Sequence, residues 1–393
     1  MLRDNFKIIA ILCLISSLGR FVLDSYLPSL PAISEQFSIS DTKTQLTLTV
    51  YLLGFSISQL IYGPLSDRYG RRSVILFGMI IFLFGSLLCS IASIPSILLM
   101  ARLITGIGAG ACGVLNRAIA SDCFHGAEFS KAWSYTTTTL VFTLIFAPVL
   151  GGYVQQEFGW RANFGLATLF IAVTLFIVLR FLPETHTPLT KHPLKIPRIV
   201  KEYYRILTSP MFIMCTLCYT LAFSGLIIYF QVSPLLYINV FGLSPTQYGW
   251  SSIIIANSYL IGGVLVNKLA RHVSLHKLLF IGTGLLIIGG LLMLLAYYLN
   301  YANVITVLIP SAIYVIGARI IIPNAIAGSM DKSRYASGSS SALIGCIQML
   351  GSSLISLLIA NFDYETPFPL ALFLTILGLI TCFITYFLPA KSK

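Results

Sequence analysis

Long apolar segments follow one another along almost the whole 393-residue sequence, and this feature constrains the fold most strongly. An α-helix needs about 20 residues to cross about 30 Å of hydrocarbon, and lipid requires each backbone polar group to find a partner within the protein. Twelve segments reach this length, and they lie near residues 7–29, 46–66, 73–93, 96–118, 132–154, 163–183, 210–237, 247–268, 276–298, 303–325, 337–360 and 368–388. The sequence therefore predicts an all-α membrane protein with twelve transmembrane helices.

The composition agrees with a chain embedded in the lipid bilayer. Hydrophobic residues make up 57% of the chain and charged residues only 10%, too few for an ordinary water-facing surface. A formal charge of +12 could indicate binding to nucleic acid, but the basic residues lie in short loops between the apolar segments. We therefore expect no nucleic-acid partner.

The distribution of basic residues predicts the orientation in the membrane. If both termini are cytoplasmic, 20 of the 25 Lys and Arg residues face the cytoplasm, and only Lys43 and Arg161 face the outside. Such an asymmetry is typical of membrane proteins whose basic loops stay in the cytoplasm. The remaining three, Arg20, Arg102 and Arg319, fall inside the apolar segments.

A long connection and a weak internal repeat indicate two halves. The connection at 184–209 is rich in proline and basic residues, and Ala-Arg recurs at 101–102 and 318–319. We expect an N-terminal six-helix bundle at 1–183, a cytoplasmic linker at 184–209 and a C-terminal six-helix bundle at 210–393. In transporters built from two related halves, the substrate site lies between them.

The loop after the second span carries the most specific motif, G-P-L-S-D-R-Y-G-R-R from Gly63 to Arg72. It resembles the loop between the second and third helices of the major facilitator superfamily. The resemblance implies the two-bundle fold of that family and a conformational latch in which glycines form a tight turn and charged residues pair with neighbouring helix ends. Its residues here would be Gly63, Asp67, Arg68, Gly70 and Arg71, although basic residues at this place also enforce topology.

Two further segments resemble functional subgroups of the same superfamily. Arg102, in L-M-A-R-L-I-T-G-I-G-A-G, is similar to the fourth-helix motif of proton-coupled members, where the arginine faces the cavity. The segment A-P-V-L-G-G, with Pro148, Gly151 and Gly152, resembles the fifth-helix motif of exporters. A proline bends a helix and glycines permit close contact, so ordinary helix packing would also explain this segment.

The bicyclomycin and chloramphenicol-resistance branch is the most similar subgroup, on segments such as D-S-Y-L-P-S-L-P from Asp24 and N-R-A from Asn116. Arg20 and Arg319 depart from that pattern. The resemblance implies a proton-driven exporter in the bacterial inner membrane. A proton-coupled uptake symporter for a small anionic metabolite would share the fold and remains the alternative.

Asp24 is the one carboxylate that we place within the hydrocarbon region, and a buried ionisable side chain indicates function. Asp24 and Arg102 fall at similar depth, which suits a site that exchanges protons during transport. Alternatively, Asp24 forms a permanent ion pair with Arg20, which lies four residues earlier on the same helical face.

Three arginines against one aspartate leave excess positive charge inside the membrane, which favours anionic substrate groups near Arg20 and Arg319. Aromatic residues could form an apolar wall, and the candidates are Tyr51, Tyr135, Phe142, Tyr229, Phe230 and Trp250. The expected substrate is a drug-like amphipath or an anionic metabolite such as a polycarboxylate siderophore.

Other protein classes find little support. The five histidines fall in loops without metal-ligand spacing, and we find no phosphate-binding glycine loop, so we expect no enzyme activity, catalytic residue, metal site or cofactor. The expected partners are a small-molecule substrate, protons and lipid. Because each chain contains a complete candidate site, we expect a monomer.

Overall fold

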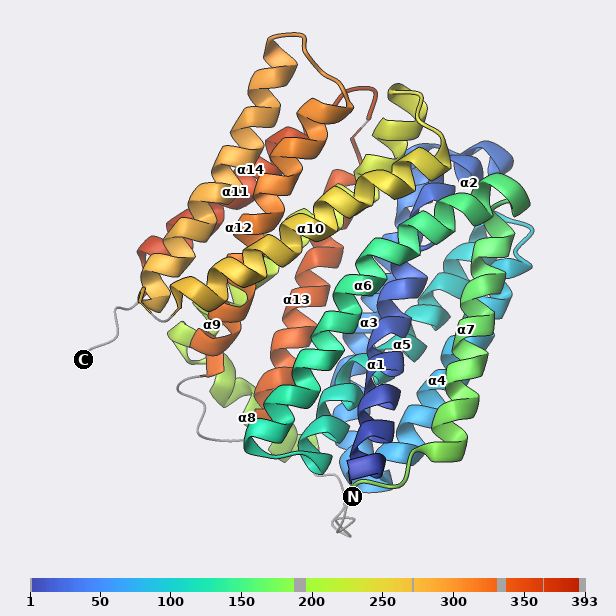
Figure 1. The fold of residues 1–393 in the computed structure, drawn as a ribbon, viewed down its shortest axis with the longest axis vertical. Helices are drawn as coiled ribbons and strands as arrows, with labels where there is room; N and C mark the ends of the chain where they lie inside the picture. The colour runs from blue at the N-terminus through green and yellow to red at the C-terminus, as the bar shows by residue number, and fades with distance from the viewer. Residues whose placement is uncertain (1, 187–195, 271, 331–336, 363, 389–393) are drawn as a thin grey trace.

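The computed structural model describes residues 2–186, 196–270, 272–330, 337–362 and 364–388 (Figure 1). Twelve spans in these residues are long and apolar enough to cross a membrane, which confirms the predicted all-α class. The helices are α1 (Leu2–Asp24), η1 (Leu27–Ser29), α2 (Leu30–Phe37), α3 (Asp41–Tyr69), α4 (Arg71–Ser90), α5 (Pro95–Cys123), α6 (Gly126–Phe158), α7 (Trp160–Phe181), α8 (Ile196–Leu207), α9 (Pro210–Pro234), η2 (Leu235–Val240), α10 (Pro245–Leu269), α11 (Leu275–Tyr298), α12 (Val304–Met330), α13 (Ser337–Ile359) and α14 (Phe368–Tyr386).

The first membrane span is interrupted near its end. The expected span at 7–29 corresponds to α1 followed by the short 3-10 helix η1, and the chain then continues into α2. Pro28 and Pro31 occupy the first turns of η1 and α2, where a missing backbone N–H costs nothing. The segment turns here because these prolines cannot extend α1.

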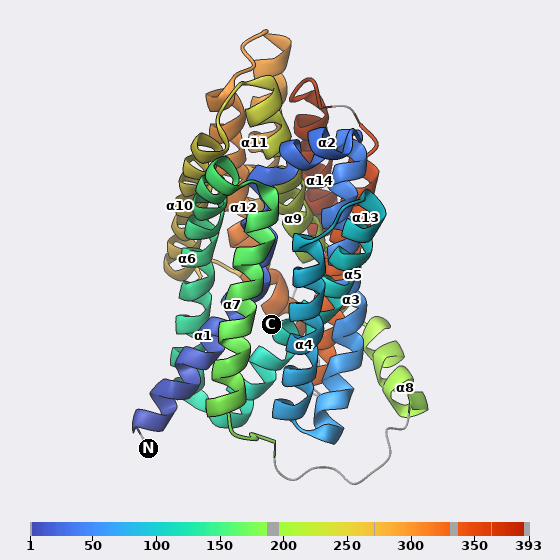
Figure 2. The same cartoon turned by 90° about the vertical axis from the view of Figure 1, so that its right-hand side faces the viewer.

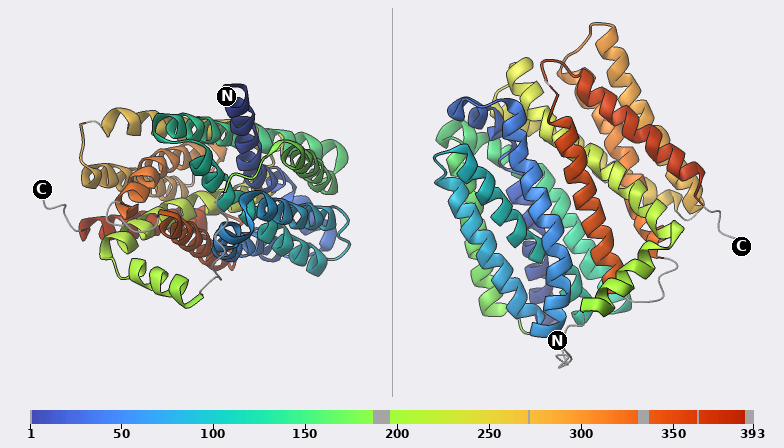
Figure 3. Two further views of the ribbon diagram at one scale, coloured as in Figure 1. Left: turned by 90° about the horizontal axis from the view of Figure 1, so that it is seen from below. Right: turned by 180° about the vertical axis from the view of Figure 1, so that it is seen from behind.

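The helices form two bundles that lie side by side, coloured blue to green and yellow-green to red (Figures 1 and 3). The first contains α1 to α7 and the second contains α9 to α14, and they meet where α3 packs on α13 and α6 packs on α10. We name the two ends of the molecule by their short helices. The α2 end contains η1 and α2. The α8 end contains α8, which directly precedes α9 in the chain (Figure 2).

The expected linker at 184–209 lies only partly within the described residues, because 187–195 fall outside them. Its second part is α8, which packs on α9 and α13 of the second bundle. Ile206 of α8 is buried in a small apolar cluster with Phe212 and Leu343. The linker thus attaches to the second bundle through a helix.

Candidate substrate cavity and the contacts around it

A cavity of about 380 Å³ lies between the two bundles and draws its wall from both. Three of the predicted substrate residues line it, namely Arg20, Tyr51 and Phe230. The wall also includes aromatic residues that the sequence did not single out, such as Phe55, Trp133, Tyr219 and Tyr259. A mainly apolar cavity with a few polar groups is the usual form of a small-molecule site.

Asp24 forms an ion pair with Arg20 on the same face of α1. Arg20 Nε lies 2.5 Å from Asp24 Oδ2, and Asp24 is fully buried while the Arg20 side chain is 18% exposed. The second carboxylate oxygen, Oδ1, has no hydrogen-bond partner in the described part of the chain. The Arg20 guanidinium also lies 5.0 Å from the centre of the Phe230 ring, so the pair connects α1 with α9 of the other bundle.

Arg102 is fully buried in an aromatic cage next to this pair. Its guanidinium carbon lies 4.2 Å from the Tyr26 ring centre and 4.5 Å from that of Tyr51, and its Nε donates to the Thr47 carbonyl at 3.2 Å. Nη1 and Nη2 have no hydrogen-bond partner among the residues described. Tyr51 therefore separates Arg102 from the cavity, and in this conformation Asp24 pairs with Arg20 rather than with Arg102.

Arg319 of α12 lies beside the cavity, in the second bundle. Its guanidinium stacks on Tyr259, 4.7 Å from the ring centre, and Val315, one turn earlier on α12, lines the cavity. Gly262 and Gly263 make room for the Arg319 side chain. A Cβ on Gly262, for example, would lie 2.7 Å from Arg319 Cβ. Because Tyr259 lines the cavity, its contact with Arg319 places Arg319 close to the substrate space.

The other predicted aromatic residues lie elsewhere. Tyr135, Phe142 and Trp250 are half exposed on the surface, and none of the three lines the cavity. Tyr229 is buried, and its hydroxyl lies 3.4 Å from that of Tyr237. None of these four residues lines the cavity, so the structure gives no support for their predicted role in substrate binding.

A cluster of uncharged polar side chains joins the bundles at the α2 end. Gln231 of α9 donates to the Gln45 side chain of α3 at 2.7 Å and accepts from the Ser356 hydroxyl of α13 at 2.6 Å. Thr49 of α3 lies 2.8 Å from the same hydroxyl. All four side chains are buried. This amide cluster closes the α2 end of the cavity with hydrogen bonds between the bundles.

We expect Gln231→Leu to shift the protein toward conformations in which the α2 end is open. The leucine would leave the Gln45 side chain without a partner in the closed state and Ser356 with Thr49 alone, and a buried unpaired group costs about 1–3 kcal/mol. The shift can be measured as the distance between spin labels at Lys43 and Asn361, which lie at this end on opposite bundles, after replacement of the eight cysteines. Gln36→Leu is the matched control, because the hydrogen bonds of the Gln36 side chain to described residues go to Trp160 and Arg161 of its own bundle. Identical distance distributions for both variants would contradict the role of the cluster.

Backbone contacts close the same end between α6 and α10. The expected exporter motif lies here, where a Cβ on Gly152 would lie 3.0 Å from the Pro245 carbonyl carbon and closer still to its oxygen. On α10, which faces this motif, a Cβ on Gly249 would lie 2.7 Å from the Pro148 carbonyl oxygen of α6. Gly151 meets the Ser25 backbone after α1 in the same way. Glycine is required because these helices touch through their backbones.

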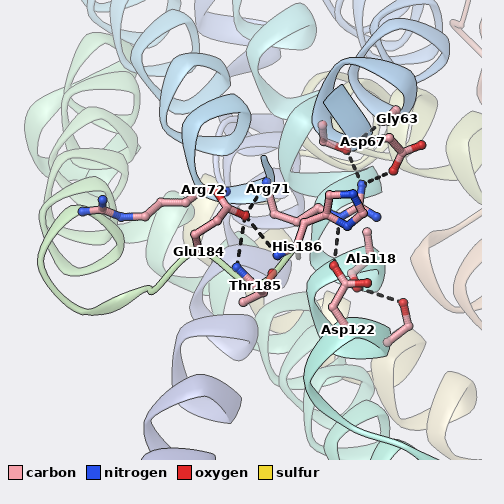
Figure 4. Close-up of polar contacts among 11 residues, drawn as sticks. Gly63, Asp67, Arg71, Arg72, Ala118, Asp122, Glu184, Thr185 and His186 are labelled. Atoms are coloured by element: carbon pink, nitrogen blue, oxygen red, sulfur yellow. Dashed lines mark hydrogen bonds and ion pairs between the residues drawn. The ribbon is translucent and has the colours of Figure 1, made fainter. Parts of the chain in front are cut away.

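The motif loop between α3 and α4 is centred on Arg71 (Figure 4). Arg71 Nη1 contacts Asp67 at 2.5 Å and the Ser66 hydroxyl at 2.6 Å, and its Nε contacts Asp122 of α5 at 2.9 Å. Arg68, by contrast, is exposed and stacks on Tyr69. The loop thus holds α3, α4 and α5 of the first bundle together, mainly through one arginine.

Glu184, which follows α7 and lies 113 residues after Arg71 in the chain, also belongs to this cluster. Its carboxylate accepts from the backbone N–H of Arg71 at 2.8 Å and of Arg72 at 3.2 Å, so it caps the start of α4 (Figure 4). Gly70 has φ +91° and lies against the same carboxylate, where no side chain would fit. Gly63 makes a looser contact with Val114, at 3.9 Å from a Cβ placed on it.

We expect Arg71→Gln to lower the thermal stability of the purified protein more than Arg68→Gln does. Loss of a hydrogen bond between charged groups costs about 1.5–3 kcal/mol, and Arg71 makes two such contacts while Arg68 is exposed. Thermal unfolding in detergent would measure the difference. Equal midpoints for the two variants would mean that Arg71 does not hold the helix ends together. A latch function of this loop during transport remains a prediction.

Two six-helix bundles around a central cavity, closed at one end by contacts between them, define a membrane transporter of the two-bundle type. Residues 9–356 match the Major Facilitator Superfamily, and the chain belongs to this family.

Curated relatives cover nearly the whole chain. Multidrug resistance protein D of Escherichia coli is 27% identical over 380 residues, which are 96% of this chain and 94% of the relative. The bicyclomycin resistance protein homolog of Haemophilus influenzae is 26% identical over 393 residues, with 99% and 98% covered. The chloramphenicol resistance protein of Pseudomonas aeruginosa is 26% identical, with 92% and 84% covered. The predicted resemblance to this branch is confirmed.

Solved structures support the fold. The xylose transporter XylE from E. coli, in a partially occluded inward open conformation, superposes with a TM-score of 0.77 at 16% identity, and 99% of each chain is covered. At this identity the likeness concerns the fold.

Proposed function

We propose that this transporter exports small amphipathic molecules in exchange for protons, across the inner membrane of a bacterium and with both termini in the cytoplasm. The observation that carries the proposal is the buried Asp24, whose partner Arg20 forms part of the cavity wall. A buried carboxylate whose arginine partner lines the cavity can exchange that partner for a proton. Substrate and proton can then use the same site at different times.

The coupling follows from how the pair can change. With the α2 end closed, Asp24 is paired with Arg20. Opening of that end would separate α1 from α9 and release Arg20 from the Phe230 ring, so that the Arg20 side chain can turn away from Asp24. A carboxylate that loses its partner in an apolar site takes up a proton. Arg102, whose Nη atoms lack partners among the described residues, supplies a second cation near Tyr51. It can attract the Asp24 carboxylate when the α2 end closes again. Asp24 would thus carry the proton and Arg102 would help to release it.

Export rather than uptake is supported by the relatives, whose names refer to resistance against several drugs, bicyclomycin and chloramphenicol. The glycine contacts between α6 and α10 also match the exporter motif. Relatives at about a quarter identity do not fix the substrate, so anionic metabolites such as polycarboxylate siderophores belong in the same test.

Proteoliposomes with an imposed pH gradient test both coupling and direction. Chloramphenicol is a suitable first probe because it is neutral and does not follow a pH gradient by itself. An exchanger accumulates substrate when the lumen is acidic, whatever its orientation, whereas a symporter accumulates it when the lumen is alkaline. Accumulation only with an alkaline lumen would replace export by uptake, and accumulation that survives collapse of the gradient by nigericin would exclude proton coupling.

A further inference from the structure

Two arginines lie beside the α8 end of the cavity, against its lining residues Trp133 and Tyr259, and no carboxylate in the described residues neutralises them. Arg117 of α5 stacks on Trp133, 5.7 Å from the ring centre, and its Nη2 contacts the sulfur of Met330 on the other bundle at 3.8 Å. A thioether is a weak acceptor for a guanidinium. Across the cavity, Arg319 stacks on Tyr259, and its buried Nε has no hydrogen-bond partner among described atoms.

Two tyrosines connect these arginines along the cavity wall. The Tyr219 hydroxyl lies near enough to both Arg117 and Tyr259 to interact with them electrostatically, and Tyr219 and Tyr259 both line the cavity. The order from one bundle to the other is therefore Arg117, Tyr219, Tyr259 and Arg319. Aromatic rings cover the faces of both guanidinium groups, so their N–H edges, apart from the weak contact of Arg117 Nη2 with Met330, remain available for a ligand.

Within the described spans, the remaining charges do not balance this pair. Arg20 and Asp24 neutralise each other, and Arg102 is enclosed by Tyr26 and Tyr51 away from the cavity. The α8 end of the cavity therefore has two positive charges in surroundings of low polarity, where electrostatic interactions are strong. Such a site disfavours a cationic ligand and favours an acidic group with a planar pair of oxygens.

We propose that Arg117 and Arg319, with the hydroxyls of Tyr219 and Tyr259, bind an acidic group of the transported molecule, so that the substrate class is anionic or zwitterionic amphipaths. This inference rests on the proposed transport function. The apolar part of the substrate packs against Phe55, Phe223 and Phe230 deeper in the cavity. Because the site takes one arginine from each bundle, the acidic group also holds the bundles together at the α8 end until substrate leaves.

Binding of matched ligands in lipid nanodiscs tests the proposal without any gradient. The probes are 4-(4-nitrophenyl)butanoate, its primary amide and the corresponding primary amine, which share a nitroaromatic ring that quenches tryptophan. Trp133 lies beside Arg117 on the cavity wall, and with Trp160→Phe and Trp250→Phe it becomes the single reporter. We expect the carboxylate to bind at least about tenfold more tightly than the amide, and the amine to bind most weakly.

Arginine variants locate the site. Arg117→Gln and Arg319→Gln should each reduce the preference for carboxylate over amide by about tenfold, whereas Arg117→Lys and Arg319→Lys should retain part of it. Arg180→Gln, on the exposed last turn of α7, is the matched control and should leave the preference unchanged. Equal affinities of wild-type protein for carboxylate and amide would overturn the proposal, and so would a preference that both Gln variants retain. Either result would leave proton-coupled transport of chloramphenicol intact, so failure of this inference is distinguishable from failure of the proposed function.

Discussion

Asp24→Asn should reduce proton-driven transport by about 100-fold or more, while leaving substrate binding within a few-fold of wild type. The amide keeps the shape of the side chain and can still accept a hydrogen bond from Arg20, but it cannot take up or release a proton. Reconstituted protein with an imposed pH gradient measures the driven rate. Exchange of labelled for unlabelled substrate without a gradient measures whether the cavity still opens to both sides.

The two measurements separate coupling from a purely structural ion pair. If Asp24 couples transport to protons, driven transport is lost and exchange without a gradient remains. If the pair with Arg20 only stabilises α1, both rates fall together with the thermal stability, because removal of one charge leaves the other buried and unpaired. Asp41→Asn, at the start of α3 and outside the cavity, is the control and should change neither rate.

The sequence was sufficient for the fold because the requirements of lipid are local. Each span must be long and apolar, and hydropathy along the chain identifies such segments without knowledge of their neighbours. The ends of the spans were less predictable. The first span was expected to continue to residue 29, whereas α1 ends at Asp24 and η1 and α2 follow, because Pro28 and Pro31 begin new helical turns.

The charged residues of the site could be identified but their partners could not. Arg20, Asp24, Arg102 and Arg319 stand out because ionisable side chains inside spans are rare. Whether Asp24 faces Arg20 or Arg102 depends on how α1 and α5 are rotated against each other, which no local pattern records. The contact of Arg71 with Glu184 was missed for a similar reason, since its two ends are 113 residues apart in the chain.

The aromatic wall was the least predictable part of the site. In a soluble protein, the polar face of a helix marks its exposed side, but a membrane helix is apolar toward both lipid and protein. Phe142 and Trp133 on α6 therefore look alike in sequence, although Phe142 is half exposed and Trp133 lines the cavity. The sequence offers one weak signal. Tyr51 and Phe55 are four residues apart and so share one face of α3, and both line the cavity.

Gly152→Val should have the second-largest effect, by opposing closure of the α2 end. The new side chain would collide with the backbone of Pro245 and Thr246, whose carbonyl carbon and Cα both lie 3.0 Å from a Cβ at this position. Neither backbone can move without separating α6 from α10, and overpacking of this kind costs about 1–3 kcal/mol. The cost falls on the closed state alone, so the ratio of open to closed molecules should rise by about 5- to 150-fold.

The same spin-label pair at Lys43 and Asn361 measures this ratio, and the transport rate should fall because each cycle must pass through the closed state. Gly165→Val is the control, since no described atom outside the adjacent backbone of its own helix lies within 4 Å of a Cβ at Gly165, and the substitution is expected to leave both quantities unchanged. A Gly152→Val protein that transports at the wild-type rate with unchanged distances would mean that α6 and α10 separate at no cost. The closed α2 end would then depend on the hydrogen bonds of Gln231, and the glycines of the exporter motif would serve only the packing of α6 against its own bundle.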